Sequence, residues 1–136
     1  MAKITLLLSL IVSISATGEW EQMCKDCKET KKLAVYSTKH ISFASNSIFH
    51  SKLIEILDAK KQVVAGFNYE LIINIGTTVC RKNNTSFEEA QNCSLQTSGY
   101  FLTCVANVWE RLWLLSTEVT EFRCSPIAYL RMFERD

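Results

Sequence analysis

Residues 53–75 read LIEILDAKKQVVAGFNYELIINI, and two apolar runs in this segment flank one glycine, Gly66. The run Leu53–Leu57 is rich in branched residues, and in the run Phe67–Ile75 apolar side chains alternate with polar ones. A period of two is typical of a strand that buries one face, and a glycine between two such runs indicates a turn or a bulge. The segment therefore predicts two antiparallel strands that meet near Gly66.

A helix is predicted before these strands. Apolar residues recur with helical spacing from Thr30 to Ala44. Short polar side chains at Ser45–Ser47 compete for backbone hydrogen bonds and end the pattern. The face expected to pack on the sheet consists of Leu33, Tyr36, His40, Ile41 and Ala44.

Two further strands are predicted after a polar loop at residues 81–92. They cover Tyr100–Val108 and about Trp113–Thr120, and the turn between them is expected at Glu110-Arg111. One helix followed by four strands predicts an α+β fold in which the helix covers one face of the sheet.

The first 16 residues read as a secretory signal peptide. Lys3 gives a positive start, Ile4–Ile14 is mostly apolar, and small residues follow at the expected cleavage region. This run is too short to span a bilayer, which takes roughly 20 apolar residues. The chain has 136 residues, so the secreted, extracellular remainder is expected to form one small domain.

Charge and composition exclude several classes of function. Without Lys3 the 15 basic residues fall to 14, which equals the 14 acidic residues. This balance disfavours nucleic acid and membrane as partners. The two histidines lie in or next to the predicted helix, and no nucleophile is paired with a base. Neither an enzyme nor a cofactor is therefore expected.

Six cysteines, all beyond the signal peptide, indicate disulfides in an oxidising compartment. A zinc site is not expected, because only His40, His50 and one C-x-x-C are present. For that C-x-x-C, Cys24 and Cys27, three interpretations stay open. A local disulfide is favoured over a link to another chain. A redox pair, the third, would need a strand before it and a helix N-terminus at it.

The five residues between the first two strands, Gln62-Val63-Val64-Ala65-Gly66, match the spacing Gln-x-Val-x-Gly. They precede Trp113 and four cysteines, Cys80, Cys93, Cys104 and Cys124. In these features the chain resembles the secreted (type 2) cystatins, reversible protein inhibitors of papain-like cysteine proteases. The resemblance implies one long α-helix packed across a curved antiparallel sheet of four to five strands. It places this domain at residues 17–124 and a C-terminal extension at residues 125–136.

The resemblance also implies a mechanism, in which two hairpins and the N-terminal segment form a wedge that blocks the active-site cleft of cathepsins and related proteases. An uncharged hairpin that is narrow at its glycine suits such a cleft, and tryptophan is a frequent hot spot. The residues expected to bind the protease are Gly18, Gln62, Val63, Val64, Ala65, Gly66, Leu112 and Trp113. The implied disulfides are Cys80–Cys93 and Cys104–Cys124.

Two departures from the family pattern favour an alternative, a secreted cystatin-fold protein with weak or lost inhibition and a binding or host-defence role. The family's Pro-Trp pair is Leu112-Trp113 here, and the loss of proline removes preorganisation. Signal cleavage after Ala16 would leave only Thr17 ahead of Gly18, so the N-terminal trunk is nearly absent. The intact Gln-x-Val-x-Gly sequence favours inhibition instead.

Further roles fall on asparagines. In some cystatins an asparagine in the helix-to-strand turn contacts legumain, an asparaginyl endopeptidase. Asn46 matches that position, but the aspartate that follows in the family is Ser47 here, and an ordinary turn residue is the alternative. Glycosylation motifs begin at Asn83, Asn84 and Asn92 in the polar loop, for which an unglycosylated loop is the alternative.

Overall fold

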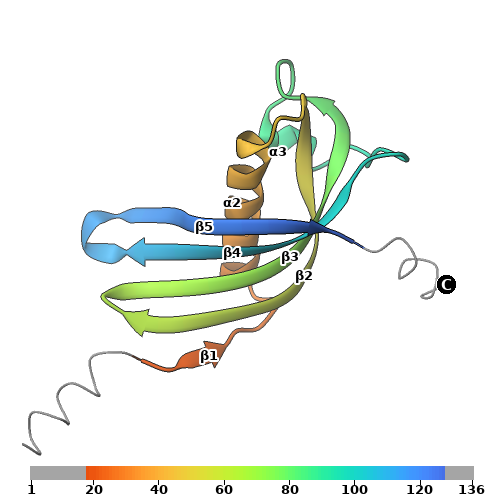
Figure 1. The fold of residues 1–136 in the computed structure, drawn as a ribbon. Helices are drawn as coiled ribbons and strands as arrows, with labels where there is room; N and C mark the ends of the chain where they lie inside the picture. The colour runs from red at the N-terminus through yellow and green to blue at the C-terminus, as the bar shows by residue number, and fades with distance from the viewer. Residues whose placement is uncertain (1–17, 128–136) are drawn as a thin grey trace, which may run out of the picture.

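The computed structural model describes residues 18–127, so the predicted signal peptide and most of the predicted C-terminal extension lie outside the described residues. In chain order the elements are β1 (Trp20–Gln22), α2 (Lys28–Ala44), β2 (Phe49–Val64), β3 (Gly66–Arg81), α3 (Phe87–Ala90), β4 (Phe101–Arg111), a 3₁₀ turn η1 (Leu112–Leu114) and β5 (Ser116–Pro126). The α+β prediction is confirmed, because α2 lies across one face of a five-stranded antiparallel sheet (Figure 1). Within the described range no helix has both the length and the apolar character needed to cross a membrane.

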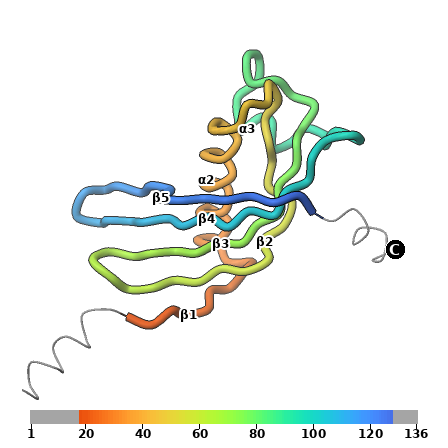
Figure 2. Tube along the Cα trace, in the orientation of Figure 1, coloured from red at the N-terminus to blue at the C-terminus, as the bar shows by residue number. Residues whose placement is uncertain are grey.

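The sheet is a simple meander, in which strands β1 to β5 are neighbours in the order of the chain (Figure 2). The longest pair, β2 and β3, runs from Phe49 opposite Arg81 at one end to Val64 opposite Gly66 at the other. Irregularities in this pairing occur at three places along β2. Such bulges bend a strand and increase its twist, which lets the sheet curve over α2.

The face of α2 that packs on the sheet is only partly the one predicted, since Leu33 and Ile41 are buried but the other three residues are not. Tyr36, His40 and Ala44 are exposed. The buried face consists of Thr30, Leu33, Ala34, Ser37, Thr38, Ile41 and Ser42. The hydroxyls of Ser37 and Thr38 donate to the carbonyls one turn earlier, at 2.9 and 2.8 Å, so they are buried without losing a hydrogen bond. Apolar spacing alone did not identify the whole face, because serine and threonine occupy several of its buried positions.

Alternation along β3 did identify its buried face. Tyr69, Leu71, Ile73 and Ile75 are all buried, and the alternate residues of β4 that face the same side are Cys104, Ala106 and Val108. Together with Leu33 and Ile41 of α2 they form the single core under the helix.

The predicted polar loop at residues 81–92 contains the short helix α3, which corrects the prediction. Ser86 caps it, since its Oγ accepts a hydrogen bond from the Glu89 N–H at 3.1 Å and donates to Glu89 Oε1 at 3.0 Å. Phe87 and Ala90 are buried beneath the loop. The signal was the Ser-x-x-Glu spacing of a capping box, which is visible in the sequence.

The turn of the last hairpin is also later than predicted. Glu110 and Arg111 belong to β4 and pair with Thr117 and Ser116 of β5. The turn is formed instead by Leu112–Leu115. An apolar run reads as a strand whether it is buried or lies at an exposed turn, and for this reason Trp113 was assigned to the strand.

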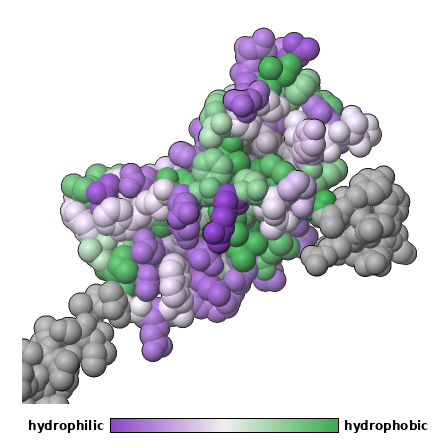
Figure 3. Space-filling view, viewed as in Figure 1, coloured by the Kyte–Doolittle hydropathy of each residue, from purple (hydrophilic) through white to green (hydrophobic). Residues whose placement is uncertain are grey.

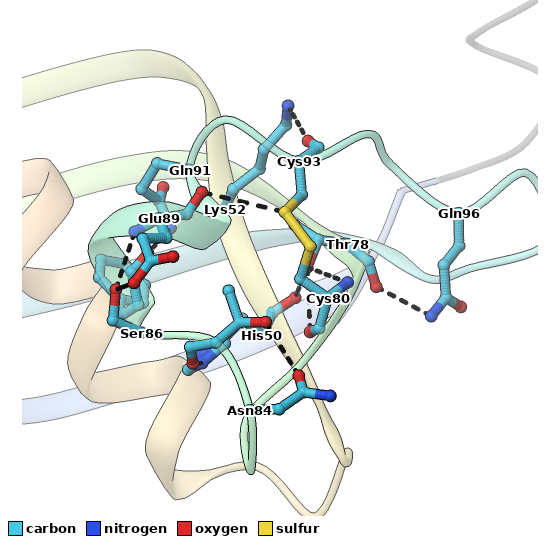
Figure 4. Close-up of a disulfide and its surroundings, with 12 residues drawn as sticks. His50, Lys52, Thr78, Cys80, Asn84, Ser86, Glu89, Gln91, Cys93 and Gln96 are labelled. Carbon is cyan, nitrogen blue, oxygen red and sulfur yellow. Dashed lines mark hydrogen bonds between the residues drawn. A yellow bond between two sulfur atoms is a disulfide. The ribbon is translucent and has the colours of Figure 1, made fainter.

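Three disulfides link Cys80 to Cys93, Cys104 to Cys124 and Cys24 to Cys27. The first ties the end of β3 to the segment after α3, where Lys52 Nζ donates to the Cys93 carbonyl at 2.7 Å (Figure 4). The first two bonds are the pairs that the resemblance implied. The third lies between β1 and the start of α2, with Cys27 at the N-cap. This bond is the local disulfide favoured for Cys24 and Cys27, and it is flanked by a strand and a helix N-terminus.

Candidate functional site

Three segments that are far apart in the sequence lie at one end of the sheet. They are Gly18 before β1, the tip of the β2–β3 hairpin at Gln62–Gly66 (the first tip), and the tip of the β4–β5 hairpin at Leu112–Leu115 (the second tip). Both tips project to the left in Figure 1, and β1 lies beside the first of them. Every residue predicted to contact a papain-like protease therefore falls at this end of the molecule.

The first tip is shaped by Gly66. Val64 pairs with Gly66, which leaves Ala65 at the apex, and Gly66 has a φ of +89°, a conformation that residues with a side chain rarely adopt. A Cβ on Gly66 would lie 2.2 Å from the carbonyl oxygen of Glu110 in β4. The glycine is therefore required by the protein's own packing, because it lets the first hairpin lie directly against the base of the second.

Gly18 and Gln62 hold the N-terminal segment against the first tip. The Gly18 N–H donates to the Val63 carbonyl at 2.9 Å, and Gln62 Nε2 donates to the Gly18 carbonyl at 3.0 Å. A Cβ on Gly18 would lie 2.9 Å from that same Val63 oxygen. The side chain of Gln62 thus fixes the segment that enters the sheet at β1.

Trp109 of β4 braces the apex of the first tip, a role that sequence reasoning missed. Its Nε1–H donates to the Ala65 carbonyl at 2.9 Å, and the Arg111 guanidinium lies 4.3 Å from the centre of its ring. Val108, the residue before it, is buried in the core. An aromatic residue on the outer face of a strand close to a turn was the available signal.

The second tip is held mainly by its own backbone. The N–H of Leu115 donates to the Leu112 carbonyl at 3.2 Å and closes the 3₁₀ turn, and Leu115 has left-handed backbone angles. Leu112 and Trp113 are each 59% exposed. Trp113 is therefore a surface tryptophan and not a core residue.

Beneath the tips a tyrosine joins three elements. The hydroxyl of Tyr69 in β3 lies 3.2 Å from a carboxylate oxygen of Glu29 in α2 and 3.2 Å from one of Glu110 in β4. Burial of the ring, followed by the two nearby negative charges, raises the pKa of Tyr69 well above its usual range. The hydroxyl is therefore neutral at every physiological pH, and it links the start of α2 to the base of the second hairpin.

The combined surface of the tips is uncharged. No Asp, Glu, Lys or Arg occurs in Gln62–Gly66 or in Leu112–Leu115, and some hydrophobic side chains are visible among polar ones at the left-hand end in Figure 3. A narrow apolar ridge on a braced sheet can lose water against the walls of a cleft, with little backbone left to order on binding. It carries no group suited to acid, base or nucleophilic chemistry.

The other predicted positions lie at the opposite end of the sheet. Asn46 is exposed in the bend after α2, next to the end of the β2–β3 hairpin where Phe49 pairs with Arg81. Side-chain bonds in this bend come from its serines: the Ser47 Oγ accepts from the Phe49 N–H at 3.1 Å, and the Ser45 Oγ donates to the Ser42 carbonyl at 2.8 Å. The side chains at the three glycosylation motifs, Asn83, Asn84 and Asn92, are exposed.

The described residues thus form one helix across a five-stranded meander sheet, with Gly18 and two uncharged hairpin tips together at one end. The cystatin family model, described as "Cystatin domain", matches residues 19–113. The chain belongs to the cystatin family, whose members are protease inhibitors and not enzymes.

Known relatives and structures agree with this assignment. Cystatin-1 of Chilobrachys guangxiensis is 33% identical over 91% of this chain and 95% of its own length. L-cystatin of Tachypleus tridentatus is 35% identical over 86% of this chain and 90% of its own. Among solved structures, dimeric human cystatin F superposes with a TM-score of 0.72 at 29% identity, covering 82% of this chain and 90% of that one. A salivary cystatin from the soft tick Ornithodoros moubata superposes with a TM-score of 0.67 at 27% identity, covering 79% and 97%.

Proposed function

We propose that this cystatin is a secreted, reversible and competitive inhibitor of papain-like cysteine proteases, the cathepsins among them. In this proposal the wedge of Gly18, Gln62–Gly66 and Leu112-Trp113 enters the active-site cleft and keeps substrate out. No bond of the inhibitor is cleaved, so inhibition is non-covalent.

One observation carries the proposal, namely that hydrogen bonds between the segments hold the wedge together before any protease is present. The Gly18 N–H donates to the Val63 carbonyl at 2.9 Å, and Gln62 Nε2 donates to the Gly18 carbonyl at 3.0 Å. The Trp109 Nε1–H fixes the apex of the first tip by donating to the Ala65 carbonyl at 2.9 Å. Segments that are already ordered lose little conformational entropy on binding, so more of the energy of apolar burial remains as affinity.

The two tips contribute different kinds of apolar contact. Val63 is 51% exposed and presents a rigid branched side chain beside the glycine of the first tip. Trp113 presents a large apolar ring, and buried aromatic residues at the centre of an interface commonly contribute the most binding energy. Leu112 replaces the family's proline, but the hydrogen bond from Leu115 to Leu112 supplies part of the order that proline would give.

The test is a titration of recombinant protein against papain and a cathepsin, with wild type compared with Trp113→Ala. We expect competitive inhibition by the wild type and a loss of more than about 30-fold for the variant, which corresponds to a hot spot of about 2 kcal/mol. The matched control is Tyr100→Ala, since Tyr100 is an aromatic residue, 77% exposed, at the start of β4 away from the tips.

Three results would separate the alternatives. Equal inhibition by the wild type and both variants would place the binding site elsewhere than the second tip. A larger loss from Tyr100→Ala than from Trp113→Ala would do the same. A folded wild type that inhibits neither protease would favour the alternative function, a cystatin-fold binding protein without inhibition.

A legumain contact at Asn46 is a second proposal, supported by the exposure of Asn46 at the end of the sheet opposite to the wedge. Two binding sites at opposite ends would act independently. Asn46→Ala should then abolish inhibition of legumain and leave inhibition of papain unchanged. Equal legumain inhibition by wild type and variant would leave Asn46 as a turn residue only.

Secretion and glycosylation complete the proposal. Three disulfides suit an oxidising compartment, and the exposed Asn83 and Asn84 lie where a glycan would extend into solvent. When the chain is expressed in a eukaryotic cell, the protein should be found in the culture medium. Its mass should fall on treatment with an N-glycosidase. An unchanged mass would favour the unglycosylated loop.

A further inference from the structure

Leu115 has a backbone conformation that its side chain disfavours. Its φ is 48° and its ψ is 38°, in the left-handed region, and among the described residues it is the one non-glycine residue with a positive φ. Glycine and asparagine adopt this conformation readily, whereas a leucine there is strained by its Cβ. The fold would therefore be better served by another residue at this position.

The side chain of Leu115 buries almost no apolar area in the fold. It is 96% exposed, more than any other large hydrophobic side chain in the described part of the chain. An exposed leucine that also strains the backbone has two costs and no intramolecular contact that offsets them. Strained residues of this kind are often found where a protein contacts its ligand.

Leu115 also continues an apolar surface that is already part of the proposed site. Leu112, Trp113 and Leu114 are 59, 59 and 56% exposed, so four successive large apolar side chains face solvent at the second tip. Contiguous exposed apolar patches on a small protein usually mark an interaction surface. Only the first two of these residues correspond to the position of the family's Pro-Trp pair.

We propose that Leu114 and Leu115 are specificity-determining contacts, which select proteases whose cleft is bordered by an apolar surface beyond the point where Trp113 docks. This inference rests on the proposed inhibition and names the kind of protease that is preferred. In the strand order β1 to β5, the first tip lies between Gly18, which precedes β1, and the second tip, which joins β4 to β5. The apolar border therefore lies at the end of the cleft away from the N-terminal segment.

Charge around the second tip argues for a protein surface and against a lipid one. Its chain neighbours at 110–111 and 116–118 include Glu110, Glu118 and one cation, Arg111, whose Nη2 lies 3.9 Å from Glu118. Apolar loops or helices that bind anionic membranes are typically bordered by several lysines or arginines. The second tip lacks that border.

Shape argues against a second copy of this chain as the occupant. A stable dimer buries about 800 Å² on each partner, over a surface of 20 to 30 residues. The second tip is a projecting turn of four residues at the end of one hairpin (Figure 1). Such a projection fits a concave partner, and the hydrogen bond from Trp109 to Ala65 fixes it beside the first tip, which enters the same cleft.

The test compares Leu115→Asn and Leu115→Gly with wild type. Both replacements suit a left-handed conformation and remove the apolar side chain, so both variants should unfold at a urea concentration equal to or higher than that of wild type. Their inhibition of papain-like proteases with an apolar cleft border should weaken about tenfold or more. Inhibition of proteases in which that border is charged should change less than about threefold.

The matched control is Ile48→Asn, because Ile48 is 57% exposed in the bend after α2, away from both tips. It removes a similar exposed apolar side chain and should leave the inhibition constants for all papain-like proteases unchanged. Size-exclusion chromatography and binding to vesicles of phosphatidylserine and phosphatidylcholine are measured for the same three variants. A dimer or vesicle binding that disappears with Leu115→Asn would overturn the proposal in favour of the other occupant.

The remaining outcomes separate this inference from the proposed function. If wild type inhibits papain and Leu115→Asn inhibits every protease equally well, the specificity role is wrong and the inhibitor function stands. If the loss is the same for apolar and charged cleft borders, Leu115 is a general contact and does not select its partner. If wild type inhibits none of the proteases, the proposed function fails and the inference fails with it.

Discussion

The first and second tips lie at the same end of the sheet, but they are held in different ways. The first tip makes hydrogen bonds to Gly18 on one side and to Trp109 on the other, and Gly66 lies directly against Glu110. The second tip is closed by one turn of its own and leaves four large apolar side chains in solvent. The first therefore supplies a fixed shape, and the second supplies apolar area.

This difference explains which tip departs from the family pattern. A substitution in the first tip disturbs Gly18 before β1 or Glu110 in β4, so Gln62 and Gly66 are both constrained by the fold. A substitution in the second tip, such as leucine for proline at Leu112, changes little inside the molecule. Substitutions in the second tip can therefore adapt it to a different protease with little loss of stability.

The largest effect is expected from Gly66→Ala. The new Cβ would lie 2.2 Å from the Glu110 carbonyl oxygen, and the φ of +89° is unfavourable for alanine. The two terms together should lower the free energy of unfolding by about 2–4 kcal/mol. Urea denaturation measures the loss, and inhibition of papain should fall as the first tip moves.

Ala65→Ser is the control for Gly66→Ala, because Ala65 is exposed at the apex of the same tip. It should leave the unfolding midpoint within experimental error of wild type. A Gly66→Ala protein as stable as Ala65→Ser would show that the two hairpins are not in tight contact.

A smaller effect, on stability at alkaline pH, is expected from Tyr69 at the base of both hairpins. Burial and two carboxylates raise its pKa, whereas in the unfolded chain the pKa is about 10. The folded protein thus holds the phenol proton at a pH where the unfolded chain releases it. Stability from this group is fully present below pH 10 and decreases above it, by up to about 1.4 kcal/mol between pH 10 and 11.

Urea denaturation at a series of pH values measures this slope. Tyr69→Phe removes the titrating group, so its slope between pH 10 and 11 should be shallower than that of wild type. Identical slopes for the two proteins would contradict the assignment of the effect to Tyr69.

Trp109→Phe should sharpen the contrast between the tips with a moderate effect. It keeps an aromatic ring beside Arg111 and removes the hydrogen bond to the Ala65 carbonyl, worth about 1 kcal/mol of stability. Inhibition of papain should weaken about fivefold, because the first tip is less well ordered. Trp113→Phe is the matched control for stability and should unfold at the wild-type midpoint, since Trp113 lies at an exposed turn.

Much of the fold was predictable because its signals are local. Alternation along residues 67–75 gave the buried face of β3, and the polar turn at Ser45–Ser47 gave the end of α2. The buried face of α2 was only partly predictable from apolar spacing, since Ser37 and Thr38 are buried through bonds to their own helix. The turn of the last hairpin was missed because Leu112–Leu115 resembles a buried strand.

The residues proposed for the wedge follow from the sequence pattern, but their contacts within the molecule do not. The Gln-x-Val-x-Gly spacing identified Gln62 and Gly66, whereas their bonds and contacts to Gly18 and Glu110 involve residues 44 positions apart in each case. Trp109 and Leu115 carried no motif at all. Only the three-dimensional arrangement shows that one braces the first tip and that the other is exposed.

The smallest effect is expected at the N-terminal edge of the wedge. Gly18 contributes two hydrogen bonds, its N–H to Val63 and its carbonyl to Gln62, and the chain ahead of it is short if the signal peptide is cleaved after Ala16. Few side chains are then available to follow the cleft, and ordering each free residue costs about 1–2 kcal/mol.

A protein that begins at Glu21 should therefore inhibit papain about threefold less well than one that begins at Thr17, and in any case less than tenfold. A protein that begins at Gly18 isolates the two hydrogen bonds and should match the longer protein. If the loss for the truncated protein exceeds that for Trp113→Ala, the N-terminal segment is the main contact, and binding energy does not come chiefly from the two tips.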